Sequence, residues 1–283
     1  MTKLLYLECT SGISGDMCAA ALLDAGASEE AVRRALESLP VEGFAVEISR
    51  VKKSGLDVCD FSVVLDAAHE NHDHDMAYLH GHGGTSEHGH DHDHGHAHDH
   101  DHGHGAPGGH HHRGPAEIAQ IIDGAAMTDG AKAIAHRMFG FVADAEARAH
   151  GVPVGKVHFH EVGAVDSIAD IIAIAVAADD LAPDGVVVSD LPCGYGTVRC
   201  QHGLIPVPAP ATAFIAEAAG LMLSPVDVEG ELVTPTGAAA AAALRTEAAL
   251  PERFSIKAIG MGAGKRAYDT PGILRAMIIE PAE

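Results

Sequence analysis

The chain has 283 residues, of which 47% are hydrophobic and 20% charged, so it can build a sizeable core in one large domain or two ordinary ones. Its formal net charge of −22 argues against binding to a nucleic-acid backbone or an anionic membrane surface, since both require a cationic face. Aromatic residues make up only 4% and Trp is absent, so base-stacking platforms are not expected.

The N-terminal segment MTKLLYLECTSG carries one lysine and a short apolar run before Gly and Ser, so we do not interpret it as a signal peptide. No apolar run is long enough to cross a membrane. The five cysteines are odd in number and contain no C-x-x-C pair, which favours a reducing compartment over a disulfide framework. We therefore predict a cytoplasmic protein.

Residues 1–68 are predicted to form an N-terminal α/β part. Ser28 is a suitable N-cap and Pro40 ends the helix that follows it. Apolar and polar residues alternate from Phe44 to Val51, which indicates a half-buried strand. The expected order is strand, helix, helix, strand, strand, over residues 3–8, 17–25, 28–39, 44–51 and 57–65.

The composition changes sharply in residues 69–114. From His69 to His112 the chain carries 17 of its 22 histidines, mixed with Asp and Gly. Because this segment has almost nothing apolar to bury, we expect a disordered insertion. A solvated low-complexity linker and an expression tag are the alternatives, but a tag would be a terminal homopolymer, whereas this tract is internal and irregular.

Imidazole nitrogens suit Ni(II), Zn(II), Cu(II) and Co(II), and the interleaved Asp residues attract divalent cations. We therefore predict weak, multi-site binding of a transition metal. The sequence does not select the metal, because raw affinity favours copper at most such sites. The histidines of the densest part are His88, His90, His92, His94, His96, His98, His100, His102 and His104.

Residues 115–283 are predicted to form the main α/β part, in one fold with residues 1–68. Thr128 caps a long helix that Gly151 and Pro153 terminate, and the segment 166–181 is apolar on nearly every side, as in a central buried helix. The further helices are expected over 115–123, 209–219 and 235–244, and the strands over 185–189, 255–260 and 272–279. This alternation predicts an α/β or mixed α+β fold with helices packed on a mixed sheet.

The first candidate site is the segment Ser11–Asp16 (SGISGD), between a strand and a helix. Its small residues let backbone N–H groups approach an anion at a helix N-terminus, which suits a phosphate-bearing ligand. A Gly-rich turn capped by Asp16 is the alternative. The predicted cofactor-binding residues here are Ser11, Gly12, Ser14 and Gly15.

The second candidate site is the segment Val157–Gly163 (VHFHEVG) with the start of the next helix. In an extended segment His158 and His160 point to the same face, and Asp166 and Asp170 share one face of the helix. Two imidazoles that converge on carboxylates make a metal or acid–base site. The alternative is a helix N-terminus that is merely charge-matched by aspartates. The catalytic candidates are Asp16, Glu161, Asp166 and Asp170.

Two further segments carry possible ligands. Cys200 and His202 share a face if they lie on one strand, and form a soft–borderline pair suited to nickel or zinc; a buried Cys beside a surface His is the alternative. The segment Gly260–Arg266 (GMGAGKR) lacks the spacing of a P-loop, but it offers Lys265 and backbone groups to a phosphate.

The chain resembles the LarC nickel-insertion family. The motifs YLECTSGISGDM, VHFHEVGAVDSIADI, GTVRCQHGLIPVPAPAT, GELVTPTGAA and GAGKR occur in the family's order, with a histidine-rich insertion where the family places one. The resemblance implies a nickel insertase that loads Ni(II) into pyridinium-3,5-bisthiocarboxylic acid mononucleotide. The product is the nickel-pincer cofactor of lactate racemase-type enzymes. The family couples insertion to CTP hydrolysis with Mn(II) or Mg(II).

The resemblance covers the N-terminal portion of the family, so it implies that a C-terminal domain associated with CTP is a partner supplied separately. An oligomer is compatible with the sequence. In the expected mechanism the His tract collects nickel, His158, His160, Cys200 and His202 pass it inward, and residues 11–16 hold the cofactor phosphate. The alternatives are a non-catalytic nickel storage or delivery protein and a metal-dependent hydrolase.

Overall fold

The computed structural model describes residues 2–66, 113–157, 159, 165–200 and 203–282. Nearly all of the predicted insertion at 69–114 lies outside these residues, including every histidine of its dense part. The predicted site residues His158, His160, Glu161 and His202 also lie outside them.

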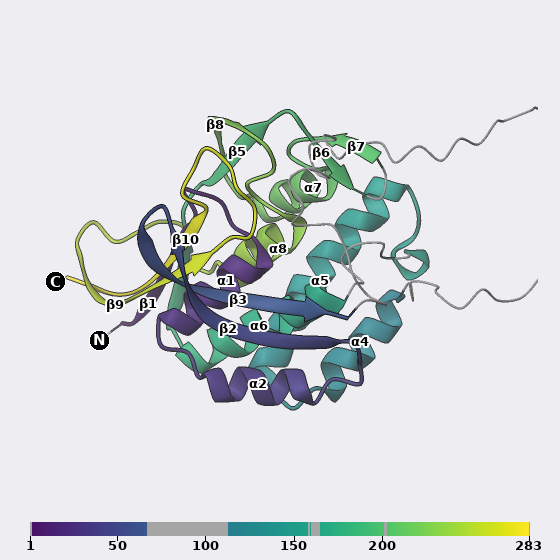
Figure 1. The fold of residues 1–283 in the computed structure, drawn as a ribbon, viewed down its shortest axis with the longest axis horizontal. Coiled ribbons are helices and arrows are strands. Elements are labelled where there is room, and N and C mark those ends of the chain that lie inside the picture. Colours follow the sequence, from purple (N-terminus) through teal and green to yellow (C-terminus); the bar gives the residue numbers. More distant parts are fainter. Residues whose placement is uncertain (1, 67–112, 158, 160–164, 201–202, 283) are drawn as a thin grey trace, which may run out of the picture.

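Within the described residues, helices and strands alternate through the chain, as predicted (Figure 1). The helices are α1 Gly15–Asp24, α2 Glu29–Glu37, α4 Pro115–Gly124, α5 Asp129–His150, the 3-10 turn η1 Val154–Lys156, α6 Val165–Leu181, α7 Pro210–Ala219 and α8 Pro235–Leu244. The strands are β1 Leu4–Glu8, β2 Phe44–Lys53, β3 Leu56–Leu65, β4 Gly185–Val188, β5 Leu191–Tyr195, β6 Thr197–Cys200, β7 Gly203–Pro206, β8 Leu223–Glu229, β9 Phe254–Ala263 and β10 Ile273–Pro281.

The main sheet has six strands in the order β2-β3-β9-β10-β1-β4. The pairs β2–β3, β9–β10 and β1–β10 are antiparallel, whereas β1–β4 and β3–β9 are parallel. The sheet is therefore mixed, as the sequence predicted, and it combines strands from both sides of the segment 67–112.

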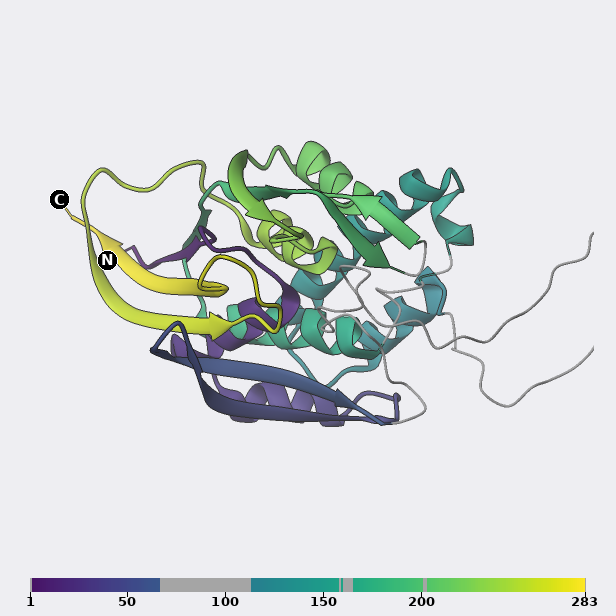
Figure 2. The same cartoon turned by 45° about the horizontal axis from the view of Figure 1, so that its top comes forward.

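Helix α1 connects the sheet to the helical layers. It packs against β9, β3 and β10 on one side and against α6 on the other, and α6 packs in turn against α5 (Figure 2). Helix α6 has buried residues around most of its circumference, which confirms the central buried helix expected from its apolar sequence. This arrangement places the first turns of α1 and α6 side by side.

Glycines in β9 allow α1 to approach the sheet closely. A Cβ atom at Gly260 would lie 2.0 Å from the carbonyl oxygen of Ala21, and one at Gly262 would lie 2.0 Å from that of Met17. Because alternate residues of a strand share a face, this spacing presents a surface without side chains to the helix. Two glycines of the segment 260–266 thus serve packing between backbones.

Two small sheets were not predicted. Strands β5 and β8 pair in parallel, and β6 and β7 form an antiparallel hairpin. All four are short or contain proline (Pro192, Pro206 and Pro225), a residue that lacks the N–H needed for a regular ladder. In the described part of the chain, no helix is long and apolar enough to span a bilayer.

Candidate functional site

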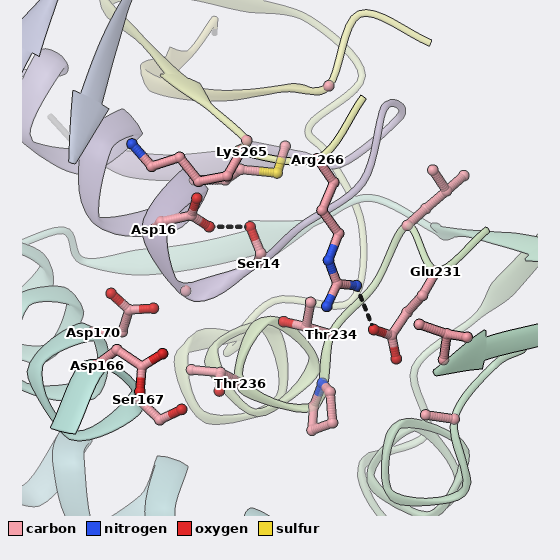
Figure 3. Close-up of a pocket in the computed structure, with 18 of the residues that line it drawn as sticks. Ser14, Asp16, Asp166, Ser167, Asp170, Glu231, Thr234, Thr236, Lys265 and Arg266 are labelled. Atoms are coloured by element: carbon pink, nitrogen blue, oxygen red, sulfur yellow. Dashed lines mark hydrogen bonds and ion pairs between the residues drawn. The ribbon is translucent and has the colours of Figure 1, made fainter. Parts of the chain in front are cut away.

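A cavity of about 140 Å³ lies where the first turns of α1, α6 and α8 meet the connection between β9 and β10 (Figure 3). Most of its polar lining is carried by these four elements, and β6 adds Arg199 and Cys200. The polar residues around it are Ser11, Ser14, Asp16, Asp166, Ser167, Asp170, Arg199, Cys200, Glu231, Thr234, Thr236, Lys265, Arg266 and Tyr268.

Candidates from all four predicted segments line this cavity. They are Ser11, Ser14, Gly15, Asp16, Asp166, Asp170, Cys200 and Lys265. Gly12 is not part of the lining. Its φ is +110°, and a Cβ there would lie 2.4 Å from the carbonyl oxygen of Leu232, so this glycine serves backbone packing.

The segment Ser11–Asp16 is hydrogen-bonded to the chain just before α8. The amide of Gly12 donates to the carbonyl of Cys9, and the amide of Ile13 donates to that of Leu232. The amide of Thr234 donates back to the carbonyl of Ile13. Two of the amides expected to cradle a phosphate are therefore used within the fold, and this segment instead holds α1 and α8 together.

One wall of the cavity is acidic. Asp16 is only 9% exposed and lies in the first turn of α1. Its Oδ1 accepts a hydrogen bond from the Ser14 hydroxyl, while its Oδ2 is buried without a hydrogen-bond partner among the described residues. Asp166 and Asp170 follow on α6. Figure 3 shows all three carboxylates on the same side of the cavity.

Asp170 has the most perturbed environment of this wall. Burial raises the pKa of its carboxyl well above the usual range, and the nearby charges of Asp16 and Asp166 raise it further, with Lys265 opposing. A Cβ at Gly15 would lie 2.8 Å from the Asp170 Cβ, so only glycine fits where α1 passes this residue. A carboxyl whose pKa is raised in this way is suited to taking up or releasing a proton.

The connection between β9 and β10 forms a basic wall, in which Arg266 lies across the cavity from the carboxylates and Lys265 extends above Asp16 (Figure 3). Arg266 pairs with the buried Glu231 at 2.6 Å, and Lys265 pairs with Asp60 of β3 at 2.5 Å. Lys53 lies nearby and donates to the carbonyl of Arg266 at 3.0 Å; its burial lowers the pKa of its ammonium group, with Asp16 and Asp60 opposing. Sequence reasoning singled out Lys265 but missed Arg266 and Glu231, because their pairing joins distant parts of the chain.

Cys200 lies at the end of β6 and pairs with Gly203, the first residue of β7. His202 lies outside the described residues, so the expected pair of Cys200 and His202 on one strand face stays a prediction. Among the residues that the structure describes, no three His, Cys, Asp or Glu side chains are grouped closely enough to hold a metal ion.

Comparisons with known proteins identify the family. A family model described as nickel insertion protein matches residues 5–283. A pyridinium-3,5-bisthiocarboxylic acid mononucleotide nickel insertion protein from Alkaliphilus metalliredigens is 47% identical over 282 residues, which are 99% of this chain and 61% of that relative. Proteins of the same name from Geobacillus kaustophilus and Staphylococcus saprophyticus are 37% and 33% identical, each over 98% of this chain and 60% of the relative.

The chain spans about three fifths of the length of these curated relatives. No solved structure matches it. The family model nevertheless extends over all of the segments that line the cavity. The chain belongs to the nickel insertion protein family.

Proposed function

We propose that this chain is a nickel insertase that places Ni(II) into pyridinium-3,5-bisthiocarboxylic acid mononucleotide, and that the cavity between α1, α6 and α8 binds this nucleotide. The observation that carries the proposal is that one cavity presents groups of both charges, with Arg266 across the cavity from Asp16 and Asp170 and with Lys265 above Asp16 (Figure 3). The names of the relatives support the choice of substrate.

The substrate carries charges of both signs. Its phosphate and thiocarboxylates are anionic, whereas the pyridinium ring and the incoming Ni(II) are cationic. The basic wall attracts the phosphate, and the acidic wall attracts the pyridinium ring and Ni(II), so the cavity is electrostatically complementary to the pair of reactants. Asp170, with its raised pKa, is suited to exchanging protons as metal displaces hydrogen from the ligand.

For nickel delivery we retain the predicted route. Cys200 lines the cavity and supplies a sulfur ligand, which suits ligand exchange toward the thiocarboxylate sulfurs. The histidines of the route, His158, His160 and His202, lie outside the described residues, as do those of the His tract. The product of the proposed reaction is the nickel-pincer cofactor of lactate racemase-type enzymes. A cytoplasmic location remains our expectation.

Use of CTP with Mn(II) or Mg(II) remains a prediction from the family resemblance. The described residues offer no support for a triphosphate site. The glycines at 260 and 262 pack against α1, and the Gly12 and Ile13 amides are bonded within the fold. We therefore assign no step of the reaction to CTP in this part of the molecule.

The test is an insertion assay with the unmetallated mononucleotide, nickel, CTP and Mn(II), with the metallated product detected by mass spectrometry. The chain is assayed alone and with the remaining region of a relative added as a separate polypeptide. Product in either arm supports the proposal. Nickel binding without product in both arms would overturn it in favour of a storage or delivery protein.

Deletion of residues 69–112 separates the same two functions. An insertase is expected to keep its maximal rate at saturating nickel and to lose efficiency only at low nickel. A storage protein would lose most of its nickel capacity and with it its function. The measurements are the insertion rate as a function of nickel concentration and the number of nickel ions bound per chain at equilibrium.

A further inference from the structure

We propose that Arg266 binds the phosphate of the mononucleotide at the N-terminus of α8, and that the buried Glu231 positions it. This inference rests on the proposed function and assigns the orientation of the substrate in the cavity. The phosphate faces Arg266 and Thr234, and the pyridinium ring with its metal-binding sulfurs faces Asp16 and Asp170.

Arg266 extends into the cavity rather than along its surface. In Figure 3 its side chain runs from the β9–β10 connection toward Thr234, across the space between Ser14 and α8. Its side chain is 17% exposed, so a ligand bound there is largely shielded from solvent. A guanidinium has five N–H donors in a planar fork, so one ion pair does not exhaust its capacity to bind a phosphate.

Glu231 and Tyr268 fix the direction of this guanidinium. The Glu231 carboxylate is 6% exposed and accepts from Arg266 at 2.6 Å, while the Tyr268 side chain also hydrogen-bonds Arg266. The Tyr268 ring lies directly over Gly230. A Cβ atom on Gly230 would be 2.2 Å from this ring, and the φ of Gly230 is +126°. These contacts hold the planar guanidinium of Arg266 in one orientation at the cavity, as the recognition of a phosphate requires.

The N-terminus of α8, next to Arg266, suits a phosphate better than the N-terminus of α1 does. The helix α8 begins at Pro235, and its first turn brings the positive end of the helix dipole and the hydroxyls of Thr234 and Thr236 to the cavity. The first turn of α1 instead carries the Asp16 carboxylate, which repels a phosphate. Lys265 extends above Asp16 and away from Thr234, toward its partner Asp60 (Figure 3).

The proposal is tested by binding of two probes that differ only in the phosphate. Nicotinic acid mononucleotide and nicotinic acid riboside share the pyridinium ring, one carboxylate and the ribose, and their dissociation constants are measured by calorimetry. Wild-type protein is expected to bind the mononucleotide more tightly. Arg266→Met is expected to weaken mononucleotide binding about 10- to 100-fold and to leave riboside binding within about twofold.

Glu231→Gln tests the positioning role, because it keeps the cation and the size of the side chain but removes the ion pair. We expect a loss of about 3- to 10-fold that is specific to the mononucleotide. Lys257→Met is the matched control, because Lys257 also pairs with a carboxylate, that of Glu280 at 2.8 Å, but lies outside the cavity. It is expected to change the ratio of the two constants by less than about twofold. Should Arg266→Met fail to fold, Arg266→Lys takes its place, with a smaller loss for the mononucleotide alone.

Equal losses for both probes in the Arg266 variants, or no loss for either, would overturn the phosphate assignment while leaving the proposed function intact. Equal binding of the two probes by the wild-type protein would also overturn the phosphate assignment. Wild-type protein that binds neither these probes nor the bisthiocarboxylated mononucleotide would overturn the proposed function itself.

Discussion

The two walls of the cavity have opposite charges and are built in different ways. The acidic wall stands on helices α1 and α6, which approach each other and the sheet through glycines. The basic wall stands on the connection between β9 and β10, and ion pairs with Asp60 and Glu231 hold its cations. Lys265 and Arg266 therefore have carboxylate partners, whereas Asp16 Oδ2 is buried without a hydrogen-bond partner among the described residues.

This difference indicates what each wall can do. A paired cation is fixed in direction and suits the recognition of a ligand, as for Arg266. A cluster of carboxylates that repel one another costs stability, and its charge is relieved when a cation binds or a proton is taken up. The raised pKa of Asp170 is the sign of that cost. The acidic wall is thus the side of the cavity that attracts a cation, although its described carboxylates are not grouped closely enough to hold a metal ion by themselves.

The largest expected effect on folding comes from the close packing that supports the acidic wall. Gly262→Ala would place a Cβ 2.0 Å from the Met17 carbonyl oxygen and 2.6 Å from the Ala21 nitrogen. Because both atoms belong to backbone, α1 must move, and we expect a loss of about 2–3 kcal/mol in the free energy of unfolding. Urea denaturation measures it. The matched control is Gly140→Ala in α5, where nothing lies within 4 Å and where stability should rise slightly.

Asp170→Asn is expected to slow insertion on the order of 10²-fold, since the amide cannot exchange the proton. The same variant should be more heat-stable at neutral pH. A carboxyl whose folded-state pKa is raised contributes stability that is complete below its unfolded pKa of about 3.9 and is lost as the pH rises through the folded pKa. The Asn side chain stays neutral at every pH. The Tm of Asp170→Asn should therefore exceed that of the wild type by a margin that grows from pH 4 to pH 8.

The prediction on thermal stability is checked by circular dichroism melts of the wild type and of Asp170→Asn from pH 4 to pH 8. Asp144→Asn, at an exposed position of α5, is the matched control and should show no such trend. A Tm for Asp170→Asn that falls below wild type at pH 8 would contradict a destabilising charge in the acidic wall.

Cys200→Ser is expected to reduce the apparent nickel affinity of the insertion reaction about tenfold, the lower end of the range for changes around a metal. The cause is replacement of a soft sulfur ligand at the cavity by a weakly binding hydroxyl. Cys193→Ser is the matched control, because Cys193 is similarly half-buried but lies outside this cavity. Insertion rates across a nickel titration distinguish them, and equal curves for the two variants would remove Cys200 from the route.

The smallest effect is expected where an ion pair lies in solvent. Arg34 and Glu30 form such a pair one turn apart on α2, with side chains 64% and 84% exposed. Glu30→Gln should change the free energy of unfolding by about 0.5 kcal/mol or less. Denaturation curves of this variant and of Glu231→Gln compare the two kinds of pair. If Glu30→Gln lowered the free energy of unfolding more than Glu231→Gln does, the ion pairs at the cavity would not be the more important ones.

Helices with local signals could be predicted from the sequence. The side chains of Ser28, Thr128 and Thr234 each accept a hydrogen bond in the first turn of the helix that they were expected to cap. Gly151, with φ of +63°, ends α5 as expected. These features depend on neighbours within four residues, so a single sequence contains the information.

The site was predictable only in pieces. The segment containing Asp16 and the segment containing Asp170 were each identified as candidates, but the contact of Gly15 with Asp170 joins residues that are far apart in the chain. The pair of Arg266 with Glu231 arises in the same way from long-range packing. Strands β5, β7 and β8 were missed because proline or glycine masks their extended conformation.

The most direct test of this account is a crystal structure of the protein with the unmetallated bisthiocarboxylated mononucleotide bound. The account predicts the nucleotide between the two walls, with its phosphate on Arg266 and Thr234 and its pyridinium ring facing Asp16 and Asp170. A nucleotide bound elsewhere, with this cavity unchanged, would contradict the assignment of the cavity as the site of nickel insertion.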